Sequence, residues 1–246
     1  MKYFLIGLFC TFILFITNLN QVAHARVWYE EEQKQDVTGD KIKETILIKG
    51  KINSEEKTEL QDVYLQLING ANGKTIKIPL DDGIKPNMRF VDFNHDGVKD
   101  VMITLRSTLE SSKLNSYIYS FKNHQKVNLQ VPLPMDVMSQ FQDQYQAELK
   151  VQNKTYRMDV TSRKNIYEKL GLYHNGKLNE PMELIVSPYV SLKSTYTIKG
   201  YGLMGVQRVS GAFKEDVLGE ITTVWINQSG KWQLYKSSFK NVLKKS

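Results

Sequence analysis

The chain has 246 residues, one cysteine and a formal net charge of +7 at pH 7. A single cysteine excludes a disulfide-stapled scaffold, so stability must come from a core, to which bound ions could add. The mildly basic charge suits an anionic setting such as a cell wall or lipid surface, although a solvated surface of mixed charge is the simpler explanation. Lysines gather near the end of the chain without a helix, zinc or RNA-binding motif beside them, so no nucleic-acid partner is expected.

The first 25 residues are typical of a secretory signal peptide. Lys2 precedes an apolar run over residues 3–16, and the small-x-small sequence at residues 23–25 suits a signal peptidase. A membrane anchor is the alternative, but the run is shorter than the roughly 20 residues that span a bilayer. Cys10 follows bulky Phe9, which argues against lipidation. We therefore expect a bacterial protein that is exported and either secreted or kept at the cell envelope. The mature chain should have no transmembrane segment.

Short strands alternate with turns over most of the remaining chain. Four pairs of strand-like segments flank Gly-, Asn- or Gln-containing turns and predict β-hairpins: 60–68 with 74–80, 116–121 with 126–131, 147–151 with 155–160, and 222–226 with 231–239. Repeated hairpins predict a mainly β, antiparallel protein with few short helices.

Helical signals are sparse. Residues 163–173 predict a short helix stopped by Gly171, and residues 135–145 are a weaker helical candidate. Pro132 and Pro134 interrupt the strand pattern and predict a boundary near residue 133. We expect β repeats over residues 26–132 and a C-terminal β subdomain over residues 133–246.

Two aspartate-rich segments lie 56 positions apart and align without a gap. Oxygen-bearing side chains fall at positions 1, 3, 5 and 9 of each, and an apolar residue at position 7 can offer its carbonyl. The candidate ligands are Asp36, Thr38, Asp40, Ile42 and Glu44 in the first segment and Asp92, Asn94, Asp96, Val98 and Asp100 in the second. A strand-like run follows each segment at once, and a plain hairpin turn does not require this pattern.

This spacing suits a hard cation. Ca²⁺ takes 6 to 8 oxygens at about 2.3–2.6 Å, and a loop with ligands at alternate positions wraps one ion locally. Gly97 permits the sharp reversal at position 6, where the first segment has Lys41 instead. An Asx-type turn without metal is the alternative in both segments, and it is favoured in the first. His95 should point to solvent, because an oxygen-rich loop selects Ca²⁺ over metals that prefer imidazole.

The second segment, DFNHDGVKDVMI, resembles the calcium loop of FG-GAP and VCBS repeats, which occur in integrin-type β-propellers and exported bacterial proteins. The resemblance implies bound Ca²⁺ and a β-sheet unit of about this period. An EF-hand would need Glu at position 12, where Ile103 stands, and flanking helices. Two repeats are too few for a closed propeller, so we expect two blade-like units packed on a C-terminal antiparallel sheet.

No catalytic constellation is recognisable. The chain after residue 25 has no cysteine and no Gly-x-Ser-x-Gly elbow, and His124 and His174 lie in turn-like contexts that favour solvation. Aromatic residues could form a carbohydrate- or peptide-binding face in the C-terminal half, although a core role is commoner: Trp225, Trp232, Tyr235, Tyr196 and Tyr201. The leading hypothesis is a noncatalytic calcium-binding envelope protein that contacts an anionic wall polymer or a protein partner. An exported glycan or peptide hydrolase with unrecognised catalytic acids is the alternative.

Overall fold

The computed structural model describes residues 28–53, 58–107 and 113–243. Antiparallel strands dominate these ranges, as the hairpin pattern predicts, and the chain is mainly β. The predictions for residues 1–25, including the signal peptide and Cys10, lie outside the described residues. Within the described ranges no helix is long and apolar enough to cross a membrane.

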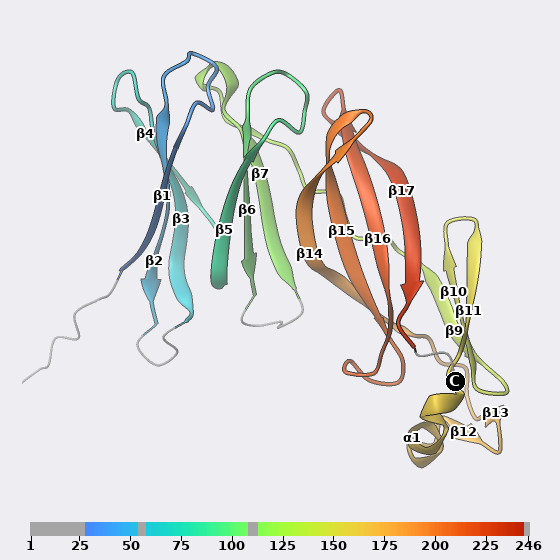
Figure 1. Ribbon diagram of the computed structural model, residues 1–246. Helices are drawn as coiled ribbons and strands as arrows, with labels where there is room; N and C mark the ends of the chain where they lie inside the picture. The colour runs from blue at the N-terminus through green and yellow to red at the C-terminus, as the bar shows by residue number, and fades with distance from the viewer. Residues whose placement is uncertain (1–27, 54–57, 108–112, 244–246) are drawn as a thin grey trace, which may run out of the picture.

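The two aligned segments belong to two four-stranded sheets of the same connectivity (Figure 1). In each sheet neighbouring strands follow one another along the chain and are antiparallel. The first sheet contains β1 (Trp28–Gln35), β2 (Glu44–Ile52), β3 (Leu60–Ile68) and β4 (Thr75–Pro79). The second sheet contains β5 (Ile84–Val91), β6 (Asp100–Arg106), β7 (Leu114–Ser120) and β8 (Val127–Asn128). Each aspartate-rich loop joins the first strand of its sheet to the second.

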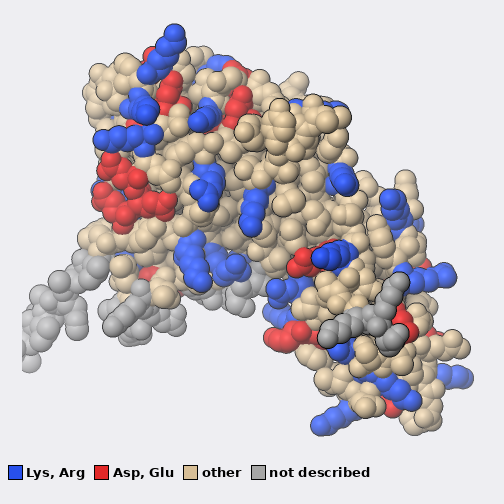
Figure 2. Space-filling model, in the orientation of Figure 1, with Lys and Arg blue, Asp and Glu red and all other residues tan. Residues whose placement is uncertain are grey.

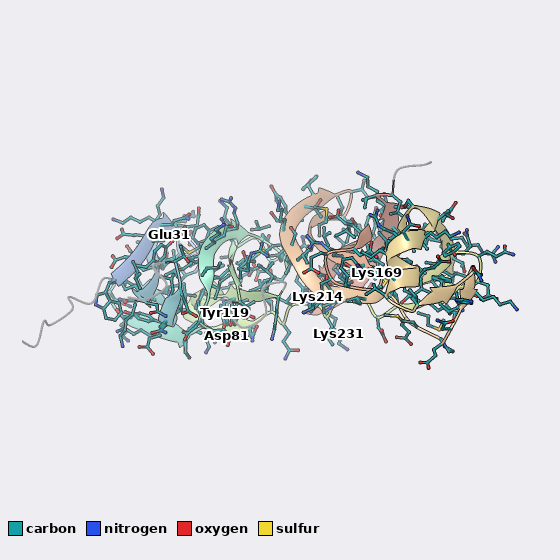
Figure 3. All side chains as sticks on the ribbon, turned by 90° about the horizontal axis from the view of Figure 1, so that it is seen from below. Glu31, Asp81, Tyr119, Lys169, Lys214 and Lys231 are labelled. Atoms are coloured by element: carbon teal, nitrogen blue, oxygen red, sulfur yellow. The ribbon has the colours of Figure 1, made fainter. Side chains whose placement is uncertain are left out.

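A third four-stranded sheet lies beside the second (Figure 1). It contains β14 (Ile185–Thr197), β15 (Gly200–Ser210), β16 (Val217–Gln228) and β17 (Lys231–Asn241). The three sheets stack face to face, and the view from below shows them following one another along the long axis of the molecule (Figure 3). This is an open stack of blade-like units.

The second sheet has a buried apolar surface on both faces because it is the middle layer. Val101, Ile103 and Leu105 of β6 pack with the first sheet. Met102, which points the opposite way along the same strand, packs with Leu192 and Leu203 of the third sheet and with Trp225. The continuous apolar run that follows Asp100 therefore reflects a strand covered on both sides.

The rest of the C-terminal half forms a smaller unit against the third sheet. Its elements are β9 (Met138–Gln142), β10 (Gln146–Val151), β11 (Lys154–Asp159), α1 (Lys164–Lys169), β12 (Tyr173–His174) and β13 (Lys177–Leu178), with a 3₁₀ turn, η2, at Thr161–Arg163. β9–β11 make a separate three-stranded sheet, so the C-terminal half contains two main sheets where we expected one. A shared core joins this unit to Val209, Leu218 and Ile221 of the third sheet.

All four predicted hairpins are present, as β3–β4, β7–β8, β10–β11 and β16–β17. The short helix is also confirmed: α1 ends before Gly171, whose φ of 73° suits a glycine after a helix. The helical prediction for residues 135–145 is wrong. That segment contains β9, because Phe141 pairs with Ala147 and buries its ring edge-on against Tyr167 and Tyr173.

Candidate metal centre in two aspartate-rich loops

The two aspartate-rich loops lie at the same edge of the sheet stack (Figure 1). The first loop, residues 36–44, runs from the end of β1 into β2, and the second loop, residues 92–100, runs from the end of β5 into β6. Because each sheet begins with the same strand–loop–strand unit and the sheets stack in the same sense, equivalent residues of the two loops face equivalent directions.

The backbone follows the same path in both loops. Positions 4 and 6 have left-handed φ angles: 84° at Gly39 and 71° at Lys41 in the first loop, 60° at His95 and 87° at Gly97 in the second. Each loop thus has one glycine and one non-glycine residue in this region. The non-glycine residues cost roughly 1 kcal/mol each relative to glycine, and the hydrogen bonds within each loop offset this cost.

The aspartate at position 1 organises each loop through main-chain N–H groups. One Asp36 carboxylate oxygen accepts a 2.9 Å hydrogen bond from the Lys41 N–H, and Asp92 accepts the equivalent 2.9 Å bond from Gly97. These bonds are compatible with either interpretation of the loops, because an Asx-type turn and a cation-binding loop both direct N–H groups at this carboxylate.

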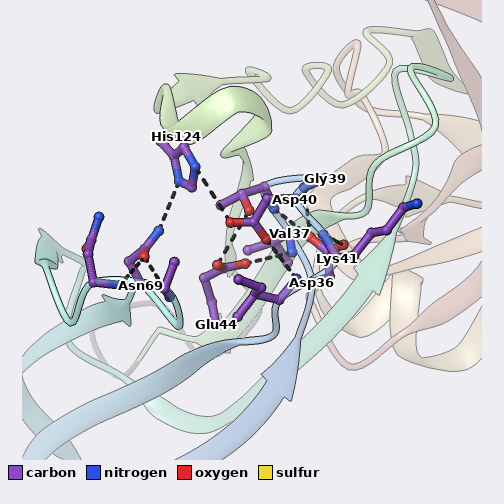
Figure 4. Close-up of polar contacts among 12 residues, drawn as sticks. Asp36, Val37, Gly39, Asp40, Lys41, Glu44, Asn69 and His124 are labelled. Carbon is purple, nitrogen blue, oxygen red and sulfur yellow. Dashed lines mark hydrogen bonds and ion pairs between the residues drawn. The ribbon is translucent and has the colours of Figure 1, made fainter.

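Position 9 distinguishes the two loops. Glu44 and Asp100 are both fully buried, and each accepts a hydrogen bond from the N–H at position 2: from Val37 at 3.1 Å and from Phe93 at 2.9 Å. The other Glu44 oxygen accepts a 3.4 Å bond from the Thr38 hydroxyl (Figure 4). The other Asp100 oxygen, Oδ1, is buried and has no hydrogen-bond partner among the described residues.

The environment of Asp100 opposes its ionisation. Burial raises the pKa of its carboxyl to about 6, and the Phe93 N–H, the Ser120 side chain and the Asn94 backbone only partly offset this effect. A buried carboxylate oxygen without a donor is costly unless a cation or a proton approaches it. The second loop therefore contains one buried carboxylate oxygen without a hydrogen bond of normal geometry, and the first loop has no such oxygen at this position.

A short turn from the second sheet contacts both loops. This turn, η1 (Lys122–His124), follows β7, and its Asn123 N–H donates a 3.0 Å hydrogen bond to the Thr38 carbonyl oxygen. Lys122 Nζ lies 2.5 Å from the carbonyl oxygen of Asp96 and 3.7 Å from its Oδ1.

His124 occupies the corresponding place at the first loop. Its Nε2 lies 3.7 Å from Asp40 Oδ2, and its Nδ1 lies 2.9 Å from the Asn69 amide nitrogen (Figure 4). The His124 side chain is still half exposed, so our expectation of a solvated histidine is only partly right: η1 folds back over the loops and brings one side of the ring against them. The sequence identified only a hairpin turn here, and no local pattern reveals what such a turn contacts.

The chemical types of the donor atoms in the second loop suit a hard cation. Asp92, Asn94, Asp96 and Asp100 supply oxygen-bearing side chains at the expected positions, and the Asp100 Oδ1 atom lacks a partner. Among the described residues, no three His, Cys, Asp or Glu side chains are grouped closely enough to hold a metal ion. An ion here would therefore need the Asn94 amide oxygen and the Val98 carbonyl as well as the carboxylates.

The first loop fits less well. Both oxygens of Asp36 accept hydrogen bonds from within the loop, as both oxygens of Asp92 do in the second loop. The difference lies at position 9, where both oxygens of Glu44 also accept hydrogen bonds. Asp40 accepts one from the Ile42 N–H at 2.8 Å and faces His124. This loop closes on itself without an unsatisfied buried oxygen, as an Asx-type turn does.

The second loop also touches the third sheet. The His95 side chain is exposed, but it packs against the β14–β15 hairpin: a Cβ added at Gly200 would lie 2.7 Å from His95 Cε1. The prediction that His95 faces solvent is thus only partly right. Gly200 has a φ of 96° and leaves the space that the imidazole fills.

The five aromatic residues do not form one face. Trp225 and Trp232 pack against the core between the second and third sheets, and the Trp225 N–H donates to the Tyr189 hydroxyl at 3.0 Å. Tyr196 and Tyr201 are exposed near the β14–β15 turn, with ring centroids 5.1 Å apart. The core explanation therefore accounts for the two tryptophans.

Together these features define a mainly β protein with three consecutive four-stranded sheets and paired aspartate-rich loops at one edge. Residues 135–240 match the family described as the YybI C-terminal domain. The chain is also 26% identical over 203 residues to the uncharacterized protein YybI of Bacillus subtilis (strain 168), which covers 77% of this chain and 76% of that protein. No solved structure matches the chain. The family match begins near residue 133, where we predict a boundary.

Proposed function

We propose that this protein is an exported, calcium-stabilised and noncatalytic β protein of a bacterial envelope, which contacts an anionic wall polymer or a protein partner. The single observation that carries the calcium part is the Oδ1 atom of Asp100, which is buried without a hydrogen bond of normal geometry in a loop that also carries oxygen-bearing side chains at positions 1, 3 and 5. The similarity to a Bacillus subtilis protein supports a bacterial setting. The secretory pattern of residues 1–25 supports export.

In this proposal the second loop holds Ca²⁺ in the manner of an FG-GAP or VCBS repeat. Asp92, Asn94, Asp96 and Asp100 would bind it through side chains, and Val98 through its carbonyl oxygen. The ion would place a positive charge next to the buried Asp100 carboxylate. Since Asp100 begins β6 and Asp92 follows β5, ion binding would fix the ends of two core strands. This describes a structural ion, as in extracellular modules with Kd near 10⁻⁴ to 10⁻³ M.

Thermal unfolding of residues 26–246 in EDTA and in millimolar Ca²⁺ tests the proposal. Calcium at about 100 times its Kd adds about 2.7 kcal/mol to the free energy of unfolding, which raises the Tm by roughly 5–11 °C for a chain of this size. We expect this shift in the wild type and its loss in Asp96→Ala. The matched variant Asp40→Ala, at the same position of the first loop, should keep the shift.

Two results would contradict this assignment. Equal Tm values in EDTA and Ca²⁺ would mean that the second loop is an Asx-type turn without metal. A calcium shift that Asp40→Ala abolishes and Asp96→Ala retains would place the ion in the first loop. Mg²⁺ at the same concentration is the specificity control, because its strict octahedral geometry suits this loop less well.

A further inference from the structure

The interface between the second and third sheets changes character along its length. Near the second loop it is apolar, where Met102 and Ile118 pack against Leu192 and Leu203. Further along the same strands, on the same face, stand Thr104 and other polar or basic residues. The two sheets therefore share a dry core at one end and enclose a polar cleft at the other.

This cleft has a volume of about 460 Å³ and is bounded by β5, β6 and β7 on one side and β14 on the other. Four basic residues line it, and none of the described residues that line it is acidic: Lys85, Arg89, Arg106 and Lys193. Figure 2 shows Lys and Arg side chains along the middle of the visible face, over β5 and its neighbours, whereas Asp and Glu gather over β1. Basic side chains thus gather over the second sheet and acidic side chains over the first strand of the first sheet.

The four basic residues have no ionic partner within the described ranges. Other cations of the protein do: Lys49 lies 2.8 Å from a Glu30 oxygen, and Arg163 lies 2.9 Å from an Asp216 oxygen. In contrast, no described acidic side chain lies within ion-pair distance of the cleft cations. Like charges gathered in a concave site repel one another and concentrate positive potential there. An anionic ligand would relieve this repulsion.

The chemistry of the lining favours phosphate groups. The guanidinium groups of Arg89 and Arg106 present planar forks of N–H donors that match phosphate oxygens. Asn87, Thr104 and Ser191 add neutral polar groups able to donate hydrogen bonds. Met102, Leu114 and Leu192 supply an apolar wall, against which the carbon backbone of a ligand can lie.

The spacing of the cations indicates an extended ligand. Arg106 pairs with Ile84 across the ladder, so Lys85 and Arg106 lie close together at one end of the cleft. Arg89 stands four residues further along β5, or about 13 Å at the usual strand rise. A single phosphate cannot contact both ends of this row. A chain that carries a phosphate at each repeat can.

We propose that the cleft between β5–β7 and β14 binds a phosphodiester-linked polyol chain, the chemistry of anionic cell-wall polymers. This inference rests on the proposed function, since the envelope location supplies the polymer, and it names the binding site and the ligand class. Lys85, Arg89, Arg106 and Lys193 contact successive phosphates. The apolar wall accommodates the polyol carbons between them.

Binding of fluorescently labelled poly(glycerol phosphate) to residues 26–246, followed by anisotropy, tests this site. The double variant Arg89→Gln/Arg106→Gln should weaken binding at least tenfold. The matched control Lys169→Gln/Lys214→Gln removes the same charge at positions in the C-terminal half (Figure 3) and should change binding less than twofold. The exposed pair Lys85→Gln/Lys193→Gln provides an independent cleft variant, should the arginine pair disturb folding.

Competing ligands decide the chemical class. Polyglutamate, phosphatidylglycerol vesicles and oligothymidylate are measured beside the polymer at 150 mM salt. Tighter binding of any of them than of poly(glycerol phosphate) overturns the ligand assignment. Equal weakening by the cleft and control variants overturns the site, because it would indicate diffuse electrostatic attraction.

The calcium proposal and the cleft proposal can fail separately. Polymer binding without a calcium-dependent Tm shift refutes the calcium proposal and supports the cleft proposal. A calcium-dependent Tm shift without polymer binding refutes the cleft proposal and supports the calcium proposal. Running each titration in EDTA and in Ca²⁺ separates these outcomes with the same protein preparation.

Discussion

Replacing Asp100 with asparagine should stabilise the protein in EDTA at neutral pH. In the wild type, burial raises the pKa of this carboxyl from 3.8 to about 6. Between pH 4 and 6 the folded protein holds a proton that the unfolded chain releases, so the free energy of unfolding falls as the pH rises. Above pH 6 the loss levels off. Asp100→Asn removes the charge and keeps an oxygen that can accept the hydrogen bond from the Phe93 N–H.

The size of the effect follows from the shift. About two pKa units at 1.36 kcal/mol each correspond to about 3 kcal/mol, which is an upper limit for the gain at pH 7. For a chain of this size the Tm rises by up to roughly 6–12 °C. At pH 4 the variant and the wild type should have nearly equal stability, because the Asp100 carboxyl is then protonated in the folded protein.

Urea unfolding of both proteins in EDTA from pH 4 to 8 measures this difference directly. Glu44→Gln is the matched control at the same position of the first loop, where both carboxylate oxygens already have donors, and it should give no such gain. Parallel pH profiles for the wild type and Asp100→Asn would refute the reasoning. In millimolar Ca²⁺ the order should reverse, since only the wild type would gain from the ion.

Four further substitutions test the loops and the cores. Gly97→Ala should destabilise the protein by about 1 kcal/mol and Lys41→Gly should stabilise it by a similar amount, because both positions require a left-handed φ. Calorimetry that shows the opposite signs would contradict the shared loop geometry. Asp216→Asn should lower the free energy of unfolding by about 2 kcal/mol, since this buried carboxylate accepts hydrogen bonds from Arg163 and Tyr167. An unchanged free energy in urea unfolding would show that these hydrogen bonds contribute nothing to stability. Ile103→Ala should cost about 3–4 kcal/mol, because its fully buried side chain lies between the first and second sheets, and a loss below 1 kcal/mol would exclude a shared core.

The loops show how far local sequence reaches. Their alternating oxygen-bearing residues and the 56-position repeat predicted two equivalent loops, each followed by a strand, and the structure has both. The N–H to carboxylate bonds of Asp36 and Asp92 depend on residues within the same loop. Such contacts are predictable because the interacting groups are close in sequence.

Other features depended on distant residues and could not be predicted locally. The helical prediction for residues 135–145 failed because pairing with β10 and the aromatic core decided that segment. The contacts of Lys122 and His124 with the two loops were missed for the same reason. Neither residue has a sequence neighbour that reveals its partner.

By itself, the sequence determined the four hairpins, the short helix and the position of the aspartate-rich loops, because side-chain alternation and turn chemistry operate over a few residues. Only the tertiary structure decided which sheet faces meet, which buried oxygen of the second loop lacks a donor, and which cations share a cleft. Arg89, Arg106 and Lys193 lie far apart along the chain and line the same space because two sheets pack at one end and separate at the other.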